Sequence, residues 1–103
     1  MIARLWTART AAANVSVYRT HIEQRVLPSL RSVAGYAGST LLSHADSDDV
    51  EIVVVTWWTS LEAIRAFAGA DVERAVVADE VRSLFERWDD RVRHYDVILA
   101  DEP

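Results

Sequence analysis

The stretch that constrains the fold most is the one where the hydrophobic period changes from that of a strand to that of a helix. Residues 52–55 are an unbroken run of β-branched side chains, which is typical of a buried strand. Over residues 61–68 the apolar side chains recur every three or four positions, which is typical of an amphipathic helix. Thr59 or Ser60 is placed to cap this helix and Gly69 to end it. The sequence therefore predicts a strand that leads directly into a capped helix.

The other elements follow from the same two periods. Strands are predicted over residues 2–9, 36–44, 50–58 and 94–99, a long helix over 11–34, and helical segments over 60–68, after Asp71 and over 80–88. Pro28 is expected to kink or divide the long helix, because proline lacks an amide donor and clashes with the preceding turn. This order predicts an α+β, ferredoxin-like split βαβ fold, in which a four-stranded antiparallel sheet carries its helices on one face.

The first strand indicates what covers the second face of this sheet. Alternation places its odd-numbered residues on one face and its even-numbered residues on the other, and neither set is fully polar. Helices cover only one face, so the other needs a different partner. A second copy of the same sheet is the simplest cover, and we predict a homodimeric α+β barrel.

Composition narrows the class of function. The 103 residues suit a single domain spanning 1–103, and the net charge of -5 offers no basic surface for nucleic acid or anionic lipid. The chain has no cysteine, no pattern of metal ligands and no phosphate-binding glycine loop, so we expect neither a metal nor a cofactor. The N-terminus does not resemble a signal peptide and no apolar run is long enough for a membrane span, so a cytoplasmic location is expected.

The strand-to-helix junction also carries a family resemblance. The run Trp58-Thr-Ser60-Leu-Glu62-Ala63, followed by Phe67 and Asp71-x-x-x-Ala75, resembles the antibiotic biosynthesis monooxygenase family. The resemblance implies a small dimeric α+β barrel. The family includes cofactor-independent oxygenases of polyketide phenols, heme degraders and isomerases, so the resemblance does not select one activity.

One branch of that family can be compared residue by residue. Its heme-degrading members use an Asn, a Trp and a His, and register through the junction motif places Thr7, Phe67 and Val77 at those positions. Val77 cannot ligate iron, and Thr7 is a poorer match to the amide. Heme degradation of that kind is therefore not expected.

The candidate catalytic residues are His94 and His21, because an imidazole titrates near neutral pH and can act as a base. The alternative for His94 is a surface or dimer-interface position, and for His21 a solvated one. Adjacent strand residues point to opposite faces, so only one of His94 and Tyr95 can line a given pocket. The candidate substrate-binding residues are Trp58, Trp57, Tyr18, Phe67, Thr7, Tyr95 and Arg65.

The leading functional hypothesis is a cofactor-independent monooxygenase that acts on a small aromatic, polyketide-like or quinol substrate. Such an enzyme needs an apolar pocket and a base or hydrogen-bond donor near the enol oxygen. Two alternatives remain open. One is a non-catalytic dimeric barrel that binds a small apolar or aromatic ligand, including a stress-related role. The other is an isomerase on the same scaffold, which needs a single well-placed acid–base residue.

Overall fold

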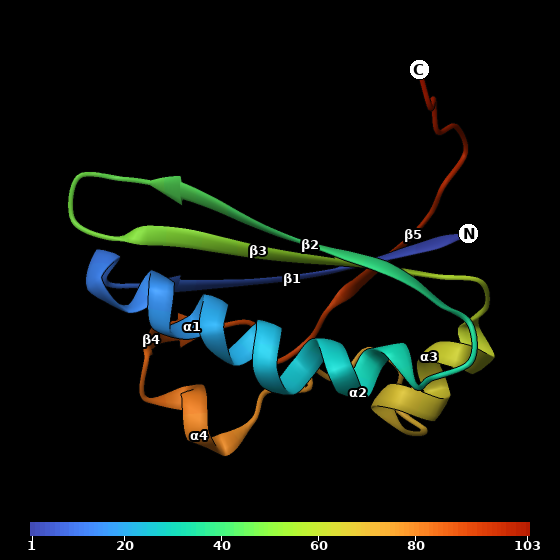
Figure 1. The fold of residues 1–103 in the computed structure, drawn as a ribbon, viewed down its shortest axis with the longest axis horizontal. Helices are drawn as coiled ribbons and strands as arrows, with labels where there is room; N and C mark the ends of the chain where they lie inside the picture. The colour runs from blue at the N-terminus through green and yellow to red at the C-terminus, as the bar shows by residue number, and fades with distance from the viewer.

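The computed structural model describes residues 1–103 as one antiparallel sheet with helices packed against one of its faces (Figure 1). The strands are β1 (Ile2–Thr10), β2 (Tyr36–Ala45), β3 (Val50–Trp58), β4 (Phe85–Trp88) and β5 (Arg93–Asp96). The helices are η1 (Ala12–Asn14), α1 (Val15–His21), η2 (Ile22–Val26), α2 (Leu27–Arg31), α3 (Leu61–Ala68) and α4 (Asp79–Arg82). The predicted α+β fold with an antiparallel sheet is confirmed.

The sheet has five strands rather than the predicted four. The order is β2-β3-β1-β4, and β5 also pairs with β1. One edge of β1 pairs with β3 along its whole length. The other edge is divided, because β5 pairs with residues 2–5 and β4 with residues 8–10. Two short strands therefore share the position for which a single strand was predicted.

The segment between α3 and β5 differs most from the prediction. No helix begins at Asp71, whose carboxylate accepts two hydrogen bonds from Arg91. The helix predicted over 80–88 is replaced by the single turn of α4 and by strand β4. β4 pairs with the end of β1, whose backbone groups would otherwise be left without partners. The helix-like apolar spacing serves here to place Phe85 against Trp6, at 5.4 Å between ring centroids.

The long helix is continuous through Pro28 but changes its hydrogen bonding. It begins as a 3-10 turn, continues as α1, becomes a π-helix over Ile22–Val26 and ends as α2. Pro28 follows the π stretch by two residues, and its missing amide donor cannot complete the bond that a regular α-helix requires there. The expected disturbance at Pro28 is thus a change of helix type without a break.

The predicted strand-to-helix junction is confirmed. The Ser60 hydroxyl accepts a hydrogen bond from the Ala63 amide, which caps α3. Gly69 follows the helix with a φ of 93°, and its amide donates to the Arg65 carbonyl. α3 packs below the end of β3, where Trp58 and Ile64 are fully buried.

The last strand is shorter than predicted, ending at Asp96 rather than Leu99. Its partner β1 begins at Ile2, so only one further bond, from the Val97 amide to the Met1 carbonyl, extends the pairing. The remaining residues leave the sheet on the side away from the helices (Figure 1). Ile98 is 96% exposed and Leu99 is 86% exposed. None of the helices combines the length and the hydrophobicity of a membrane-spanning segment.

Candidate functional site

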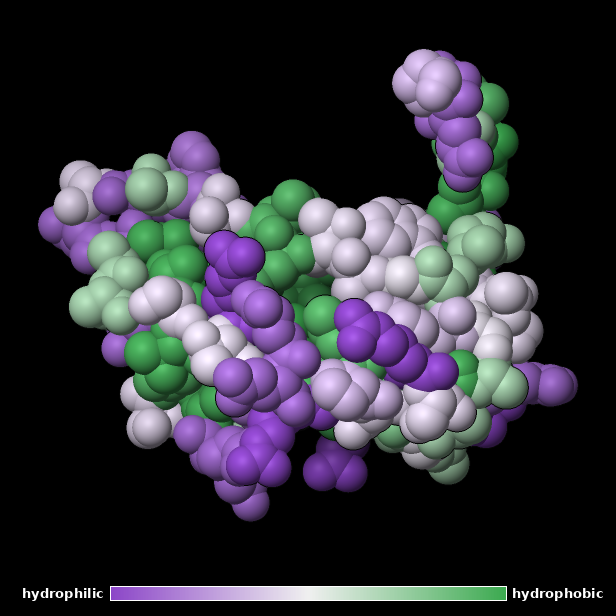
Figure 2. Space-filling view, viewed as in Figure 1, coloured by the Kyte–Doolittle hydropathy of each residue, from purple (hydrophilic) through white to green (hydrophobic).

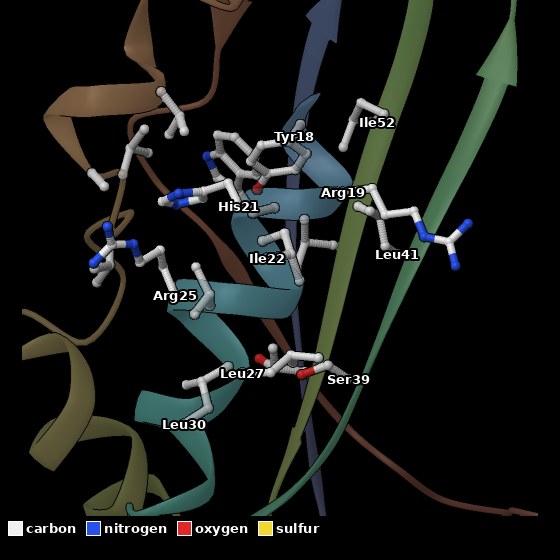
Figure 3. A pocket seen from close by; sticks show the side chains of 18 of the residues that line it. Tyr18, Arg19, His21, Ile22, Arg25, Leu27, Leu30, Ser39, Leu41 and Ile52 are labelled. Carbon is white, nitrogen blue, oxygen red and sulfur yellow. The ribbon is translucent and has the colours of Figure 1, made fainter. Parts of the chain in front are cut away.

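A cavity of about 650 Å³ lies between the long helix and the inner face of the sheet. Its size falls in the range of about 300–1,000 Å³ that is typical of small-molecule sites. Of its 27 lining residues, 17 are hydrophobic, so it favours an apolar body over a polar one. Figure 3 shows Tyr18 and Ile22 on the long helix, with Ile52 and Leu41 on the strands opposite and the His21 ring turned toward the segment that carries Glu80. In Figure 2, apolar surface is visible in the hollow between helix and sheet.

A row of polar residues crosses the floor of this cavity. Arg4 on β1 is paired with Thr56 on β3, and Thr56 is paired with Ser39 on β2, so their side chains share the inner face. All three line the cavity. Apolar clusters lie on both sides, one around Trp6 and Ile52 and the other around α3. A ligand in the cavity therefore meets hydrogen-bonding groups at the middle of an apolar floor.

Arg4 is the charged member of the row and is only 5% exposed. Its Nη1 donates to the Val72 carbonyl oxygen at 2.5 Å and its Nη2 to the Arg74 carbonyl oxygen at 2.7 Å. The guanidinium also lies over the Phe67 ring, 5.7 Å from the centroid. Burial lowers the pKa of Arg4 to about 10, so the side chain still carries its charge at neutral pH.

His94 contacts Arg4 but does not line the cavity. Its Nε2 is 2.9 Å from Arg4 Nη1, and because a guanidinium only donates hydrogen bonds, Nε2 is the acceptor. Burial, and then the charge of Arg4, lower the pKa of His94, while Glu73 opposes this shift. His94 is thus a neutral ring whose free lone pair is engaged by Arg4, which makes it a support for Arg4 rather than a base facing a ligand.

Tyr18 and His21 form the second polar group of the cavity. Their rings stack with centroids 6.2 Å apart and an interplanar angle of 23°. Tyr18 also packs edge-on against Phe85 at 5.0 Å, and burial raises the pKa of its phenol well above the usual value. Tyr18 therefore keeps its proton and can donate it in a hydrogen bond. His21 is the one histidine in the lining, and its Nδ1 lies 3.5 Å from Glu80 Oε1.

The other residues singled out in the sequence are distributed over both faces of the sheet. Phe67 and Val77 line the cavity. Trp58 is fully buried and stacks on Phe67 at 5.5 Å, so it anchors α3 instead of contacting a ligand. Four further candidates lie outside the cavity: Thr7, Trp57 and Tyr95 on the outer face of the sheet and Arg65 on α3. Thr7 donates its hydroxyl proton to Asp89.

Sequence reasoning missed Arg4, Thr56 and Ser39. The signal for Arg4 was present, since a cation stood between Ile2 and Trp6 on one face of an otherwise apolar strand. A charged residue at such a position is either paired or functional. For Thr56 and Ser39 the sequence held no such signal, because hydroxyl side chains are common on strands. No group of three or more His, Asp or Glu side chains is placed to hold a metal ion.

Comparison with proteins of known structure agrees with this fold. The chain is 16% identical to an MhuD variant crystallised with two manganese protoporphyrin IX molecules per active site, with a TM-score of 0.71 and full coverage of both chains. It is 18% identical to the heme-degrader MhuD from Mycobacterium tuberculosis with two hemes in its active site, at a TM-score of 0.68, covering 99% of this chain and 100% of that one. A candidate antibiotic biosynthesis monooxygenase from Bacillus cereus, 18% identical, gives a TM-score of 0.56, covering 99% and 95% of the two chains.

At these identities the structural matches establish the fold alone. No curated protein sequence matches the chain. The family assignment comes from sequence: residues 1–79 match the family model described as antibiotic biosynthesis monooxygenase. That span contains the Trp-Thr-Ser-Leu-Glu-Ala junction and most of the residues that line the cavity. The chain therefore belongs to the antibiotic biosynthesis monooxygenase family.

Proposed function

We propose that this protein is a homodimeric, cofactor-independent monooxygenase that oxidises a small aromatic substrate of the anthrone or quinol type. The observation that carries this proposal is the cavity, which combines a mostly apolar lining with Tyr18 and His21 side by side. An apolar enclosure favours a flat aromatic substrate. A neighbouring base and hydrogen-bond donor are what the first chemical step requires.

The proposed reaction needs no reductant beyond the substrate. His21 removes a proton from the acidic methylene carbon of an anthrone, and the Tyr18 hydroxyl donates a hydrogen bond to the enolate oxygen that forms. The enolate passes one electron to O2, and recombination of the two radicals forms a C–O bond. The proton held by His21 completes a hydroperoxide, which loses water to leave the carbonyl of a quinone. One oxygen atom enters the product and the other leaves as water.

Family members that degrade heme offer a contrast in substrate. MhuD structures contain heme or its manganese analogue in the active site. In the present cavity Val77 supplies no iron ligand, and Phe67 stands where the heme-degrading branch has a tryptophan. The proposed substrate is therefore an oxidisable aromatic compound, and heme with a reductant serves as the negative control.

The test is anthrone oxidation followed as O2 uptake and anthraquinone formation. His21→Gln is expected to lower kcat by about 10²–10⁴-fold, because it removes the general base. His44→Gln is the matched control, since His44 lies near the exposed end of β2, where its side chain pairs with Asp46, and it does not line the cavity. Equal rates in the wild type and the His21→Gln variant would contradict the role of His21.

Three other results would replace the proposed function. If the wild-type protein binds anthrone but consumes no O2, it is a ligand-binding protein without catalysis. If it converts the substrate equally fast without oxygen, it is an isomerase. If the protein breaks down heme in the negative control, heme degradation is its function.

A further inference from the structure

We propose that the cavity selects aromatic acids and that Arg4 binds the ionised acid group of the ligand. This inference rests on the proposed function only in using the same cavity, and it names the class of substrate that the cavity accepts. Arg4 is a buried positive charge that has no negative partner within the chain.

No carboxylate of the chain forms an ion pair with Arg4. The acids nearest in sequence to its carbonyl partners, Asp71 and Glu73, both contact Arg91 instead, at 2.7 Å and 3.5 Å. Arg4 is held by two neutral carbonyl groups, a neutral imidazole and an aromatic ring. A buried cation without a counter-ion is costly, and a ligand anion removes much of that cost.

Arg4 also has donors to spare. A guanidinium carries five N–H donors, and the three contacts within the chain use two on Nη1 and one on Nη2. The remaining Nη2–H and Nε–H are available to a carboxylate, which a guanidinium binds with two parallel hydrogen bonds. Arg4 lines the cavity beside its strand partner Thr56, so the acid group would be bound on the floor.

The surroundings of Arg4 determine the rest of the ligand. Trp6 and Ile52 lie on one side of the polar row and Phe67 on the other, so the body of the ligand is in contact with apolar and aromatic side chains. His94 cannot replace the missing anion, because its Nε2 accepts from Arg4 as a neutral group. An aromatic ring with one ionised substituent would supply both the anion that Arg4 lacks and the apolar body that the surrounding side chains favour.

Two other arginines line the cavity and provide the competing explanation. Arg19 and Arg25 lie on the long helix and are exposed, and Arg19 pairs with Glu23 at 2.7 Å. They would attract any anion from solvent, but exposed charges are screened and contribute little. Comparison of variants at Arg4 and Arg25 therefore distinguishes specific binding at Arg4 from nonspecific electrostatic attraction.

The experiment is calorimetric titration with 2-naphthoate and with 2-naphthamide, two ligands of nearly equal shape that differ in charge. The wild-type protein is expected to bind 2-naphthoate about tenfold or more tightly than 2-naphthamide, which corresponds to one charge-assisted pair. Arg4→Met is expected to abolish this preference and leave 2-naphthamide binding within about threefold. Arg25→Met is the matched control and is expected to keep the preference.

Each alternative result is informative. Equal affinity of the wild type for both ligands, or an equal loss of the preference in Arg25→Met, overturns the role of Arg4 while leaving the cavity as a binding site. Binding of neither ligand overturns this inference and removes the support for small aromatic ligands as well. A wild-type protein that binds 2-naphthoate but does not oxidise anthrone with O2 contradicts only the proposed function.

A measurement on the wild-type chain covers the case in which Arg4→Met does not fold. A bound carboxylate offsets the charge of Arg4, so the pKa of His94, followed by NMR, is expected to rise by about one pH unit with 2-naphthoate and not with 2-naphthamide. His94→Gln assigns the signal, and His44 serves as the internal reference. An unchanged His94 titration at saturating 2-naphthoate would overturn the proposed site.

Discussion

At the residue scale, the position of Arg4 shows why a guanidinium is required there. Its planar group donates to two backbone carbonyls and one imidazole while lying over an aromatic ring. Lysine has a single nitrogen and no plane to stack, so it cannot keep these contacts together. Because the carbonyls belong to the segment that follows α3, Arg4 also joins β1 to that segment. The contacts of Arg4 within the chain and its proposed contacts with a ligand use different N–H groups of the same guanidinium.

His94 predicts a pH dependence of stability. Its ordinary pKa is 6.5 and burial together with the charge of Arg4 lowers it in the folded protein, so the unfolded chain binds the proton more readily. The contribution of neutral His94 to stability is complete above about pH 6.5 and declines as the pH falls through that value toward the folded pKa. We expect wild-type protein to lose more stability than His94→Gln between about pH 7.5 and about pH 5.

Urea unfolding at a fixed protein concentration measures this difference. The glutamine oxygen can accept from Arg4, so His94→Gln removes the titrating group while retaining an acceptor. His44→Gln is the control, because His44 is exposed on the hairpin. Parallel stability curves for the wild type and His94→Gln would contradict the prediction.

The histidines also show how far residue roles could be predicted from sequence. His94 and His21 were both recognised as imidazoles on predicted elements, but their surroundings depend on contacts distant in the chain. His94 contacts Arg4, 90 residues away, and that contact takes the lone pair a base would need. His21 faces the cavity because the whole helix packs across the sheet. The sequence therefore predicted which residues carry an imidazole, but it did not predict whether a ring nitrogen of each is free to act as a base.

At the element scale, the turn at Gly35 predicts a local weak point. Gly35 has a φ of 91°, and a Cβ placed there would lie 2.5 Å from Ala63 Cβ and 2.8 Å from Thr59 Oγ1. The Thr59 amide donates to the Gly35 carbonyl, so this turn packs directly on the start of α3. Gly35→Ala combines backbone strain with overlap and is expected to destabilise the protein by about 2–4 kcal/mol.

Gly69→Ala isolates the backbone contribution. Gly69 has a φ of 93°, but nothing lies within 4 Å of a Cβ built there. Gly69→Ala is expected to cost about 1–3 kcal/mol, because a side chain is strained at this positive φ although it meets no neighbouring atom. Urea unfolding of both variants gives the comparison. Equal losses would show that the contact between Gly35 and Ala63 relaxes freely.

The elements that were predicted correctly are those whose signals are local. The junction at Ser60 combines a β-branched run, a capping hydroxyl and a terminal glycine within a few residues, and all three appear in the structure. The prediction of a helix over residues 80–88 was wrong because the decisive signal there is not local. Their apolar spacing fits a helix, but the pairing of β4 with β1 depends on residues 75 to 80 positions earlier, which no local pattern contains.

At the scale of the whole molecule, the sheet has an uncovered apolar face. The alternation that directs Arg4 and Trp6 toward the helices directs Leu5, Val53 and Val55 away from them. Leu42 and Tyr95 on the same face are 47% and 46% exposed. Monomeric proteins rarely expose an apolar patch of this kind. The predicted homodimer accounts for it, because a two-fold contact presents the same face on both subunits.

The C-terminal segment is consistent with such a dimer. Residues 97–103 extend from the sheet on the side of the uncovered face, and Ile98 and Leu99 expose almost their whole side chains (Figure 1). In a face-to-face dimer these side chains would be placed to contact the second subunit. The apolar face and the apolar tail would then be buried by the same association, with the cavity of each subunit on the opposite side of its sheet.

Val55→Lys tests the dimer. Val55 is half-buried at the centre of the outer face, paired with Leu5 and Thr40, and a lysine there must be buried without a partner when two copies meet. We expect the wild type to have the mass of a dimer by light scattering and Val55→Lys to have that of a monomer at the same concentration. Gln24→Lys adds the same charge on the exposed surface of the helix and is expected to remain dimeric. Because the cavity opens on the other side of the sheet, a folded Val55→Lys monomer should still bind 2-naphthoate. A wild type that is monomeric at all concentrations would leave the apolar face without this explanation and contradict the predicted barrel.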